Sequence, residues 1–355
     1  MDHLNSSKKT EIILNLSCQD VHVFPTNTNS QIQPYMCTHL DLSGNHLKHV
    51  SDDEIWHFLN LTTLDLSSNQ LEYLPYGLCN LSQLKVLLVR NNVLRELPQS
   101  AQCITSLEIL NISGNELDQF PMQVLHLPRL KQLHLGGNRI PYIPKEISQM
   151  TSLENLYCGG NKLSQLPVEL GKLKSLKVLN LCDNHITILP KELAKLSQLE
   201  SLSLHNNNLT ALPIAIVKLK NLQAISVRGN PLVIRFVRSQ FSNLPSLQEL
   251  AGKTIKNNRI DYSVENLPTF LVKYLDSARK CVNPRCRGVF FDSCIRHIKF
   301  VDFCGKYRLP FEQFLCSPHD NEHWEDLASG SSTCSSSDDD DSSVEPSWMK
   351  KILLG

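Results

Sequence analysis

The 355-residue sequence lacks several features that would place it in a class at once. It contains no run of about 20 apolar residues, the length required to cross a bilayer. Residues 1–10 are polar and contain no apolar segment, so no secretory signal is expected. Lys plus Arg equal Asp plus Glu, at 35 each, so no net charge attracts the chain to nucleic acid or to an anionic membrane. These absences favour a cytoplasmic location, with nuclear presence also open, and argue against membrane and nucleic-acid partners.

The twelve cysteines lack the tightly flanking pairs that disulfide-bonded secreted repeat proteins use. Six are scattered from Cys18 to Cys182, and the other six fall between Cys281 and Cys334. Because thiols stay reduced in a chain without a signal sequence, the second group predicts a metal site rather than disulfides.

What the sequence does contain is a repeated frame. In the stretch from Leu61 to Pro75 it reads Leu-x-x-Leu-x-Leu-x-x-Asn-x-Leu-x-x-Leu-Pro, and its asparagine recurs at positions 45, 69, 92, 115, 138, 161, 184, 207 and 230. The spacing between the first two asparagines is one residue longer than the other seven spacings, which are equal. All of them fall in the range of roughly 20–29 residues that is typical of leucine-rich repeats. A degenerate copy over Leu14–Pro25 has Gln19 in place of the asparagine and predicts an N-terminal cap.

The frame has a physical interpretation. Alternate leucines such as Leu64 and Leu66 predict a short strand, centred four residues before the asparagine, with its apolar side chains pointing inward. The asparagine amide is expected to satisfy backbone groups between neighbouring coils. Leu-Pro pairs, including 212–213, are expected to end ladder pairing before a helical turn on the convex side.

The predicted fold class is α/β. It is a leucine-rich-repeat solenoid with a curved parallel sheet, about nine full repeats and an N-terminal cap, followed by a small helical and zinc-binding-like C-terminal module. Five parts are predicted: a cap and degenerate repeat at 1–36, leucine-rich repeats at 37–232, a capping helix with two short motifs at 233–275, a Cys-rich module at 276–320 and a disordered acidic tail at 321–355.

Residues between the inward leucines are predicted to line a concave face about 40 Å long, at roughly 4.8 Å per strand. Six side chains stand out there and are predicted to bind another protein: Leu88, Arg90, His134, Tyr157, His205 and Arg228. Tyr and Arg dominate the energetics of interfaces. An ordinary solvated face is the alternative. Catalysis is not expected, because no nucleophile, base and orienting group follow in a recognisable order.

After Asn230 the period stops. Ser246 and Glu249 have the spacing of a capping box that begins a helix. Leu247, Ala251 and Ile255 then fall on one face of that helix. The helix could seal the last repeat, or its apolar face could enter a partner's groove.

Two motifs in this region carry a family resemblance. The pattern Ser246-Leu247-x-x-x-Ala251-x-x-x-Ile255 resembles the box that binds the elongin B–elongin C adaptor. Leu267-Pro268, with Leu271, is similar to the opening of a cullin-2 box, whereas cullin-5 boxes usually have a second Pro where Phe270 stands. With these motifs after the repeats, the chain resembles intracellular leucine-rich-repeat substrate receptors of cullin–RING ubiquitin ligases.

The resemblance implies a receptor with no chemistry of its own. Such a receptor binds elongin C with elongin B, and cullin-2 or cullin-5 with its RING subunit, so that a captured protein is ubiquitinated and degraded by the proteasome. Leu-Pro repeats of this kind also resemble Ras-pathway scaffolds that carry no ligase box. A non-catalytic signalling scaffold is therefore the alternative.

The cysteines after position 280 predict a structural zinc site. Cys281 and Cys286 flank a turn short enough for both thiolates to share one ion. Cys316 and His319 would complete a tetrahedral set suited to zinc. Cys294 and Cys304 are reserve ligands. Buried thiols that bind no metal are the alternative.

Overall fold

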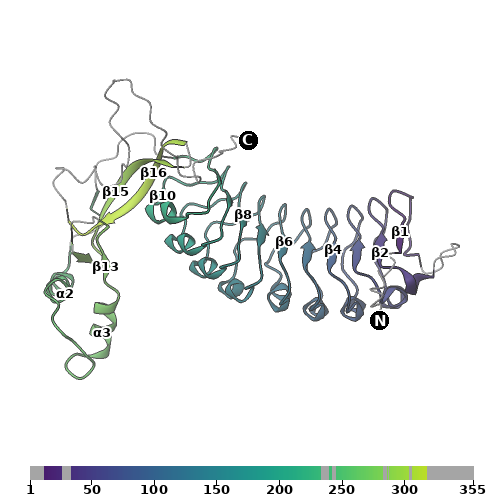
Figure 1. The fold of residues 1–355 in the computed structure, drawn as a ribbon, viewed down its shortest axis with the longest axis horizontal. Helices are drawn as coiled ribbons and strands as arrows, with labels where there is room; N and C mark the ends of the chain where they lie inside the picture. The colour runs from purple at the N-terminus through teal and green to yellow at the C-terminus, as the bar shows by residue number, and fades with distance from the viewer. Residues whose placement is uncertain are drawn as a thin grey trace, which may run out of the picture. The chain divides into compact units, whose positions relative to one another are not determined.

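The computed structural model describes residues 12–25, 33–232, 240–241, 245–282, 286, 288–303 and 306–317 of the chain. These residues form two compact units, drawn as a ribbon in Figure 1. The first unit contains the described residues up to 209 together with 215–231, and the second contains 210–214 and the described residues from 232 onward. Within this described part of the chain, no helix has both the length and the apolar character needed to span a bilayer.

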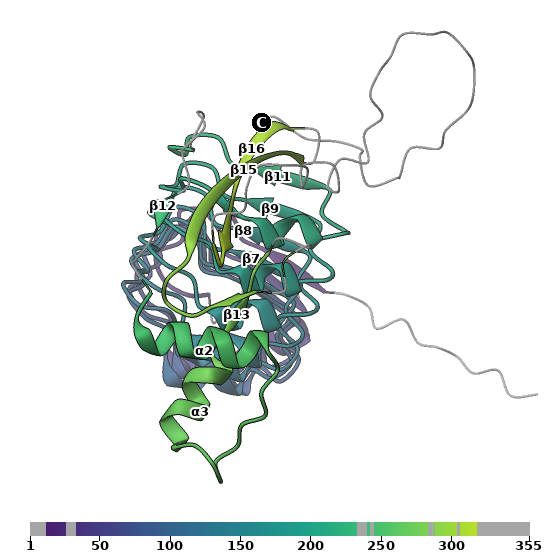
Figure 2. The ribbon, with the colours of Figure 1, turned by 90° about the vertical axis from the view of Figure 1, so that its left-hand side faces the viewer.

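The first unit is a solenoid built on one parallel sheet. Its strands follow one another in chain order: β1 (Ile13–Asn15), β2 (His39–Asp41), β3 (Thr63–Asp65), β4 (Val86–Leu88), β5 (Ile109–Asn111), β6 (Gln132–His134), β7 (Asn155–Tyr157), β8 (Val178–Asn180), β9 (Ser201–Ser203) and β11 (Ala224–Ser226). In Figure 2 the strands β7, β8, β9 and β11 lie one behind another. The inward leucines stack in register, with Leu110 opposite Leu133. The predicted leucine-rich-repeat solenoid is confirmed.

The strands lie one residue earlier than predicted. β6 is centred five residues before Asn138, not four. Pairing continues past the end of β6, because Leu135 N donates to Tyr157 O at 2.7 Å. The difference therefore concerns only the residue at which the strand is taken to end.

On the convex side the coils turn through five-residue 3-10 helices: Tyr76–Asn80, Gln99–Cys103, Met122–His126, Lys145–Gln149, Val168–Lys172, Lys191–Lys195 and Ile214–Lys218. Pro144 takes φ −72° and ψ 155° directly before one of them, since the fixed φ of proline suits an extended residue at the start of a turn. The first coils instead contain the 3-10 helices Pro34–Met36 and Trp56–Phe58 and the short helix α1 (Asp52–Ile55).

The repeat asparagines connect neighbouring coils as predicted. Nδ2 of Asn138 donates to Ile112 O of the preceding coil at 3.0 Å and to Leu135 O at 2.9 Å. Its Oδ1 accepts from Leu117 N at 3.1 Å. One side chain thus satisfies three backbone groups that would otherwise be buried without partners.

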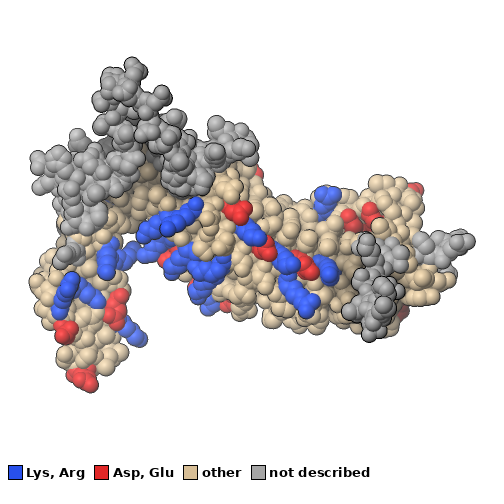
Figure 3. Space-filling model, viewed as in Figure 1, with Lys and Arg blue, Asp and Glu red and all other residues tan. Residues whose placement is uncertain are grey.

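A ladder of alternating charges crosses the repeats just before the strands. Its rungs recur once per coil and read Lys85, Glu108, Lys131, Glu154, Lys177 and Glu200. Lys131 Nζ lies 2.7 Å from Glu108 Oε2, and Lys177 Nζ lies 2.7 Å from Glu154 Oε2. The hydrogen bond from Lys131 holds the pKa of Glu108 below its usual value. Blue and red groups alternate across this part of the repeats in Figure 3. Water and salt screen such exposed ion pairs, so the pairs add little to the free energy of unfolding. Their alternating signs mainly determine which coils can lie next to each other without repulsion between like charges.

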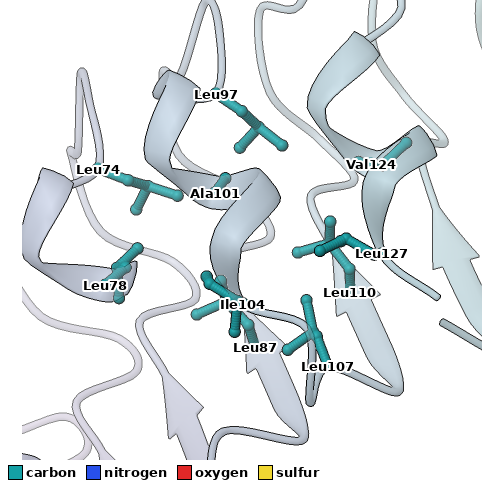
Figure 4. Close-up of a pocket in the computed structure, with 10 residues that line it drawn as sticks. All are labelled: Leu74, Leu78, Leu87, Leu97, Ala101, Ile104, Leu107, Leu110, Val124 and Leu127. Carbon is teal, nitrogen blue, oxygen red and sulfur yellow. The ribbon is translucent and has the colours of Figure 1, made fainter. Parts of the chain in front are cut away.

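A small cavity lies in the core beside Ala101. Its volume is about 10 Å³, and apolar side chains line it, as Figure 4 shows. Ala101 stands at the position where the coils on either side place Leu78 and Val124. An apolar cavity of this size offers a water molecule no partners and a ligand no room. This cavity is therefore not a ligand-binding site.

The second unit contains two sheets. The larger has the order β10 (Leu212–Pro213), β16 (Lys306–Leu315), β15 (Ile295–Phe303) and β12 (Gln240–Phe241). β15 and β16 form an antiparallel hairpin that the sequence analysis did not predict. Ile295 and Ile298 are both buried, so the apolar residues do not alternate as strand residues usually do.

The prediction that Leu-Pro at 212–213 ends ladder pairing is wrong. Leu212 and Pro213 pair in parallel with Phe311 and Glu312. Proline is tolerated there because β10 is an edge strand, where its missing N–H is not required.

Two helices pack against the smaller sheet of the second unit. That sheet joins β13 (Arg279–Lys280) to β14 (Val289–Phe290), and the helices are α2 (Leu247–Asn257) and α3 (Thr269–Asp276). A buried cluster of Leu275, Val289 and Phe291 lies between them. A side chain at Gly252 would place its Cβ 2.9 Å from Phe291, so only glycine allows α2 to approach this closely.

The predicted capping box at the start of α2 is only half formed. Ser246 Oγ accepts from Glu249 N at 3.1 Å, as expected of an N-cap. The carboxylate of Glu249 instead turns inward, where it is 2% exposed and accepts from Phe291 N and Ser293 N, each at 3.1 Å. Lys253 Nζ lies 3.3 Å from the same carboxylate. Burial acts to raise the pKa of Glu249, but these hydrogen bonds hold it below its usual value.

Candidate protein-binding surfaces

The outward face of the parallel sheet presents an aromatic pair. Strand register places His134 of β6 beside Tyr157 of β7, and their rings stack with centroids 4.3 Å apart and planes 13° apart. Burial lowers the pKa of His134, which favours the neutral ring at neutral pH. The pair forms a rigid platform with polar edges, which suits protein recognition.

The other residues predicted on this face lie apart from the pair. Leu88 is half-buried at the end of β4, while Arg90 and Arg228 are exposed on separate coils. The structure therefore brings together two of the six predicted side chains and distributes the rest along the sheet.

His205 belongs to a polar cluster that the sequence analysis only partly recognised. One ligand-type atom each from Cys182, Asp183 and His205 lies within 4.8 Å of the others. Burial and the neighbouring Asp183 raise the pKa of the Cys182 thiol to about 11, so the thiol stays protonated. Asp183 was missed, although its place next to Cys182 and one coil before His205 is visible in the sequence.

Gly159 has a packing role beside this cluster. A Cβ on Gly159 would meet Cys182 Sγ at 2.6 Å and Asn180 Oδ1 at 3.1 Å. Glycine at this position therefore makes room for the next coil of the solenoid.

The predicted adaptor-binding residues differ in exposure. Leu247 is 87% exposed and Ala251 is also exposed, on the side of α2 opposite the buried Glu249 and Gly252. Ile255 is half-buried, because it packs against the Leu275 cluster. Ser246 is occupied as the N-cap.

The cullin-box-like residues lie at the start of α3. Pro268 is its N-cap and is exposed, and Leu271 is half-buried. Leu267 packs against the Leu275 cluster and so belongs to the core of its own unit. Phe270 was not among the predicted contact residues, yet it is 67% exposed.

Three of the predicted metal ligands come together. One sulfur atom each from Cys281, Cys286 and Cys316 lies within 4.8 Å of the others. Cys294 is buried and is not part of this group. The predicted ligand His319, the reserve Cys304 and the acidic tail at 321–355 lie outside the described residues.

A family model described as a leucine-rich repeat region matches residues 54–181 and 157–270, together more than half of the chain. The chain belongs to the leucine-rich-repeat family. Members of this family bind other proteins on the extended sheet surface of the solenoid. The matched family thus indicates protein–protein interaction rather than catalysis.

Relatives and solved structures agree with this membership. Leucine-rich repeat-containing protein 58 of Xenopus laevis is 49% identical over 125 residues, which is 35% of each chain. The protein of the same name from Xenopus tropicalis is 59% identical over 88 residues, 25% of each chain. The matches thus span about a third or less of these relatives' length.

A solved chain from the octameric complex of Latrophilin 3, Unc5D and FLRT2 (LRR) has a similar fold. The TM-score is 0.53 at 26% identity, over 60% of this leucine-rich-repeat chain and 66% of the solved one. This likeness supports the solenoid.

Proposed function

We propose that this leucine-rich-repeat protein is the cytoplasmic substrate receptor of an elongin BC–cullin–RING ubiquitin ligase. The first unit binds a target protein on the outward face of its sheet. The second unit binds elongin C through α2, and cullin-2 or cullin-5 through the start of α3. The chain supplies recognition alone, and the RING subunit directs ubiquitin transfer to the target for proteasomal degradation.

The orientation of α2 is the observation that carries this proposal. A leucine that is 87% exposed, with the exposed Ala251 one turn later, leaves an apolar stripe on the helix surface. The helix is meanwhile held in its own unit from the other side, through Glu249 and Gly252. A single exposed leucine is ordinary. Here it occurs at the position where the elongin-binding pattern requires an anchor, next to a small residue that permits close approach.

The start of α3 supports the second contact. Pro268 and Phe270 are exposed, whereas Leu267 is used in the core. The cullin surface on this proposal is therefore the Pro268–Phe270 edge. Changes at Leu267 would disturb folding and would not report on binding alone.

The target-binding surface is supported by the His134–Tyr157 platform. Stacked, half-buried aromatic rings lose little side-chain entropy on binding, and tyrosine is enriched among the residues that dominate interface energies.

The adaptor contact is tested with the full-length variant Leu247→Ala/Ala251→Lys. Loss of a buried leucine side chain costs about 1.5–3 kcal/mol, so elongin BC affinity should fall roughly tenfold or more. Leu250→Ala is the matched control, since Leu250 is 47% exposed on the same helix and lies outside the predicted stripe. Affinity is measured by calorimetry with purified elongin BC, and thermal unfolding establishes that the variants are folded.

The cullin contact is tested separately with Pro268→Ala/Phe270→Ala. This variant should lose the cullin while it retains elongin BC and the target protein. Unchanged elongin BC binding by Leu247→Ala/Ala251→Lys would refute the receptor proposal and favour the signalling scaffold.

A further inference from the structure

Three cysteines from separate segments of the second unit converge on one point. Cys281 directly follows β13, Cys286 lies in the connection to β14, and Cys316 directly follows β16. Their sulfur atoms lie within 4.8 Å of one another, and the Cys286 and Cys316 sulfurs are 3.5 Å apart. Cys316 thus lies beside two cysteines that precede it by 30 or more positions in the chain.

The backbone beside these sulfurs is held by hydrogen bonds and includes a glycine in close contact with two of them. Cys281 N donates to Gly288 O at 2.9 Å, which closes the loop that carries Cys286. Gly288 N donates to Cys286 Sγ at 3.2 Å, a bond that orients the sulfur and would stabilise its thiolate form. A Cβ at Gly288 would lie 2.7 Å from Cys316 Sγ and 3.1 Å from Cys286 Sγ. Glycine is therefore required for the sulfurs to gather at this place.

The spacing of the sulfurs matches a zinc ion better than a disulfide. Three thiolates at the Zn–S distance of about 2.3 Å and tetrahedral angles would lie about 3.8 Å from one another. The observed 3.5 Å contact and the 4.8 Å limit are compatible with that spacing. A disulfide requires about 2.0 Å, and it would use two of the sulfurs and leave the third beside it.

We propose that Cys281, Cys286 and Cys316 bind one zinc ion as thiolates. Each thiol gives up its proton to solvent as its sulfur binds Zn²⁺, and no electron is transferred. The three sulfurs occupy three corners of the tetrahedron, and the fourth corner takes a further ligand. The role is structural, because the ion joins the β13–β14 sheet to the end of β16.

The surroundings agree with a structural ion. The sulfurs pack with the buried Ile295 and Leu315, and Cys281 is 9% exposed. The described part of the second unit has only small apolar clusters, and small units often need a metal to compensate for a limited core. The site is separate from α2 and α3, so the inference does not rest on the proposed ligase role.

The test measures metal in the full-length protein, purified in reducing buffer without chelator. About one zinc per chain is expected by elemental analysis. Cys281→Ser, Cys286→Ser and Cys316→Ser should each lower the zinc content severalfold. Cys103→Ser, on an exposed turn of the first unit, is the control and should retain it.

A second measurement covers the case in which a ligand variant fails to fold. The unaltered protein is reconstituted with Co²⁺ alone, and its absorption spectrum should show tetrahedral coordination with thiolate-to-cobalt bands for three sulfurs. A zinc-free protein that takes up no cobalt would overturn the proposal. So would a spectrum with fewer than three thiolates, or equal zinc in the unaltered protein and all three ligand variants.

Discussion

Ala101 shows how a single small residue departs from the repeat. Every full coil after it places a larger aliphatic residue at the corresponding position, from Val124 to Ile216. The cavity beside Ala101 is the volume that this alanine leaves unfilled. Its position follows from the repeat period, but its existence follows only from the packing of side chains in three coils.

We expect Ala101→Val to stabilise the first unit by about 0.5–1 kcal/mol, because the added methyl groups fill existing space. Val124→Ala, at the equivalent position one coil later, is the matched reverse change. It should enlarge the same cavity and destabilise by about 2 kcal/mol. Urea denaturation followed by circular dichroism measures both. A lower midpoint for Ala101→Val would mean that the neighbouring side chains already fill the space.

Asn138 and Glu249 mark the limits of residue-level prediction. The role of Asn138 was predictable because nine equivalents share one frame, and the same bonds must form in each coil. Glu249 was predicted to complete a capping box, which is a purely local pattern. Its carboxylate instead bonds to the backbone of residues 291 and 293, far along the chain, and no local spacing reveals such a contact.

At the scale of elements, α2 depends on this buried carboxylate for its position. The folded-state pKa of Glu249 lies below its unfolded value, which is about 4.3. Its contribution to stability is therefore fully present above pH of about 5 and is lost as the pH falls through the folded-state pKa.

Glu249→Gln should destabilise the second unit by about 1–3 kcal/mol near neutral pH. The amide carries no charge to pair with Lys253, and its NH2 group replaces one of the two oxygens that accept from Ser293 N. The difference from the unaltered protein should shrink below pH 4. Hydrogen exchange of peptides within 245–282, corrected for intrinsic rates, measures it. Glu265→Gln, on an exposed loop, is the control. A difference that stays constant between pH 7 and pH 3 would contradict a role for the charge.

The elements themselves were predictable to different degrees. The strands of the solenoid came directly from the spacing of leucines, to within one residue. The hairpin β15–β16 escaped prediction because its buried residues do not alternate and because its register shifts between Val301 and Phe303. Pairing of Pro213 with β16 also required knowledge of the partner strand, which sequence spacing does not provide.

At the scale of the whole molecule, the two units are stabilised in different ways. The first buries a long, periodic core of leucines, and its buried asparagines form hydrogen bonds with the backbone between neighbouring coils. The second has small clusters and three convergent cysteines. The convergence of Cys281, Cys286 and Cys316 was predicted from their sequence, whereas the glycine that permits it was not.

Removal of metal should therefore affect one unit and not the other. Incubation of the full-length protein with a strong chelator in reducing buffer should raise hydrogen exchange in peptides from 245–282 and 288–317. Hydrogen exchange of peptides from 33–209 should be unchanged, because all three proposed zinc ligands lie in the second unit. Re-addition of zinc should restore protection. Unaltered exchange throughout would show that the ion, if bound, does not stabilise this unit.

The charge ladder limits how the chain can change its length. From Lys85 to Glu200 the sign of the rung depends on whether the coil is odd or even in the series. Deletion of one coil would place two like charges side by side, whereas deletion of two consecutive coils restores the alternation. Duplication of one coil would likewise place two like charges side by side, whereas duplication of two consecutive coils would keep the alternation. Relatives that gain or lose coils in this stretch are therefore expected to do so in pairs.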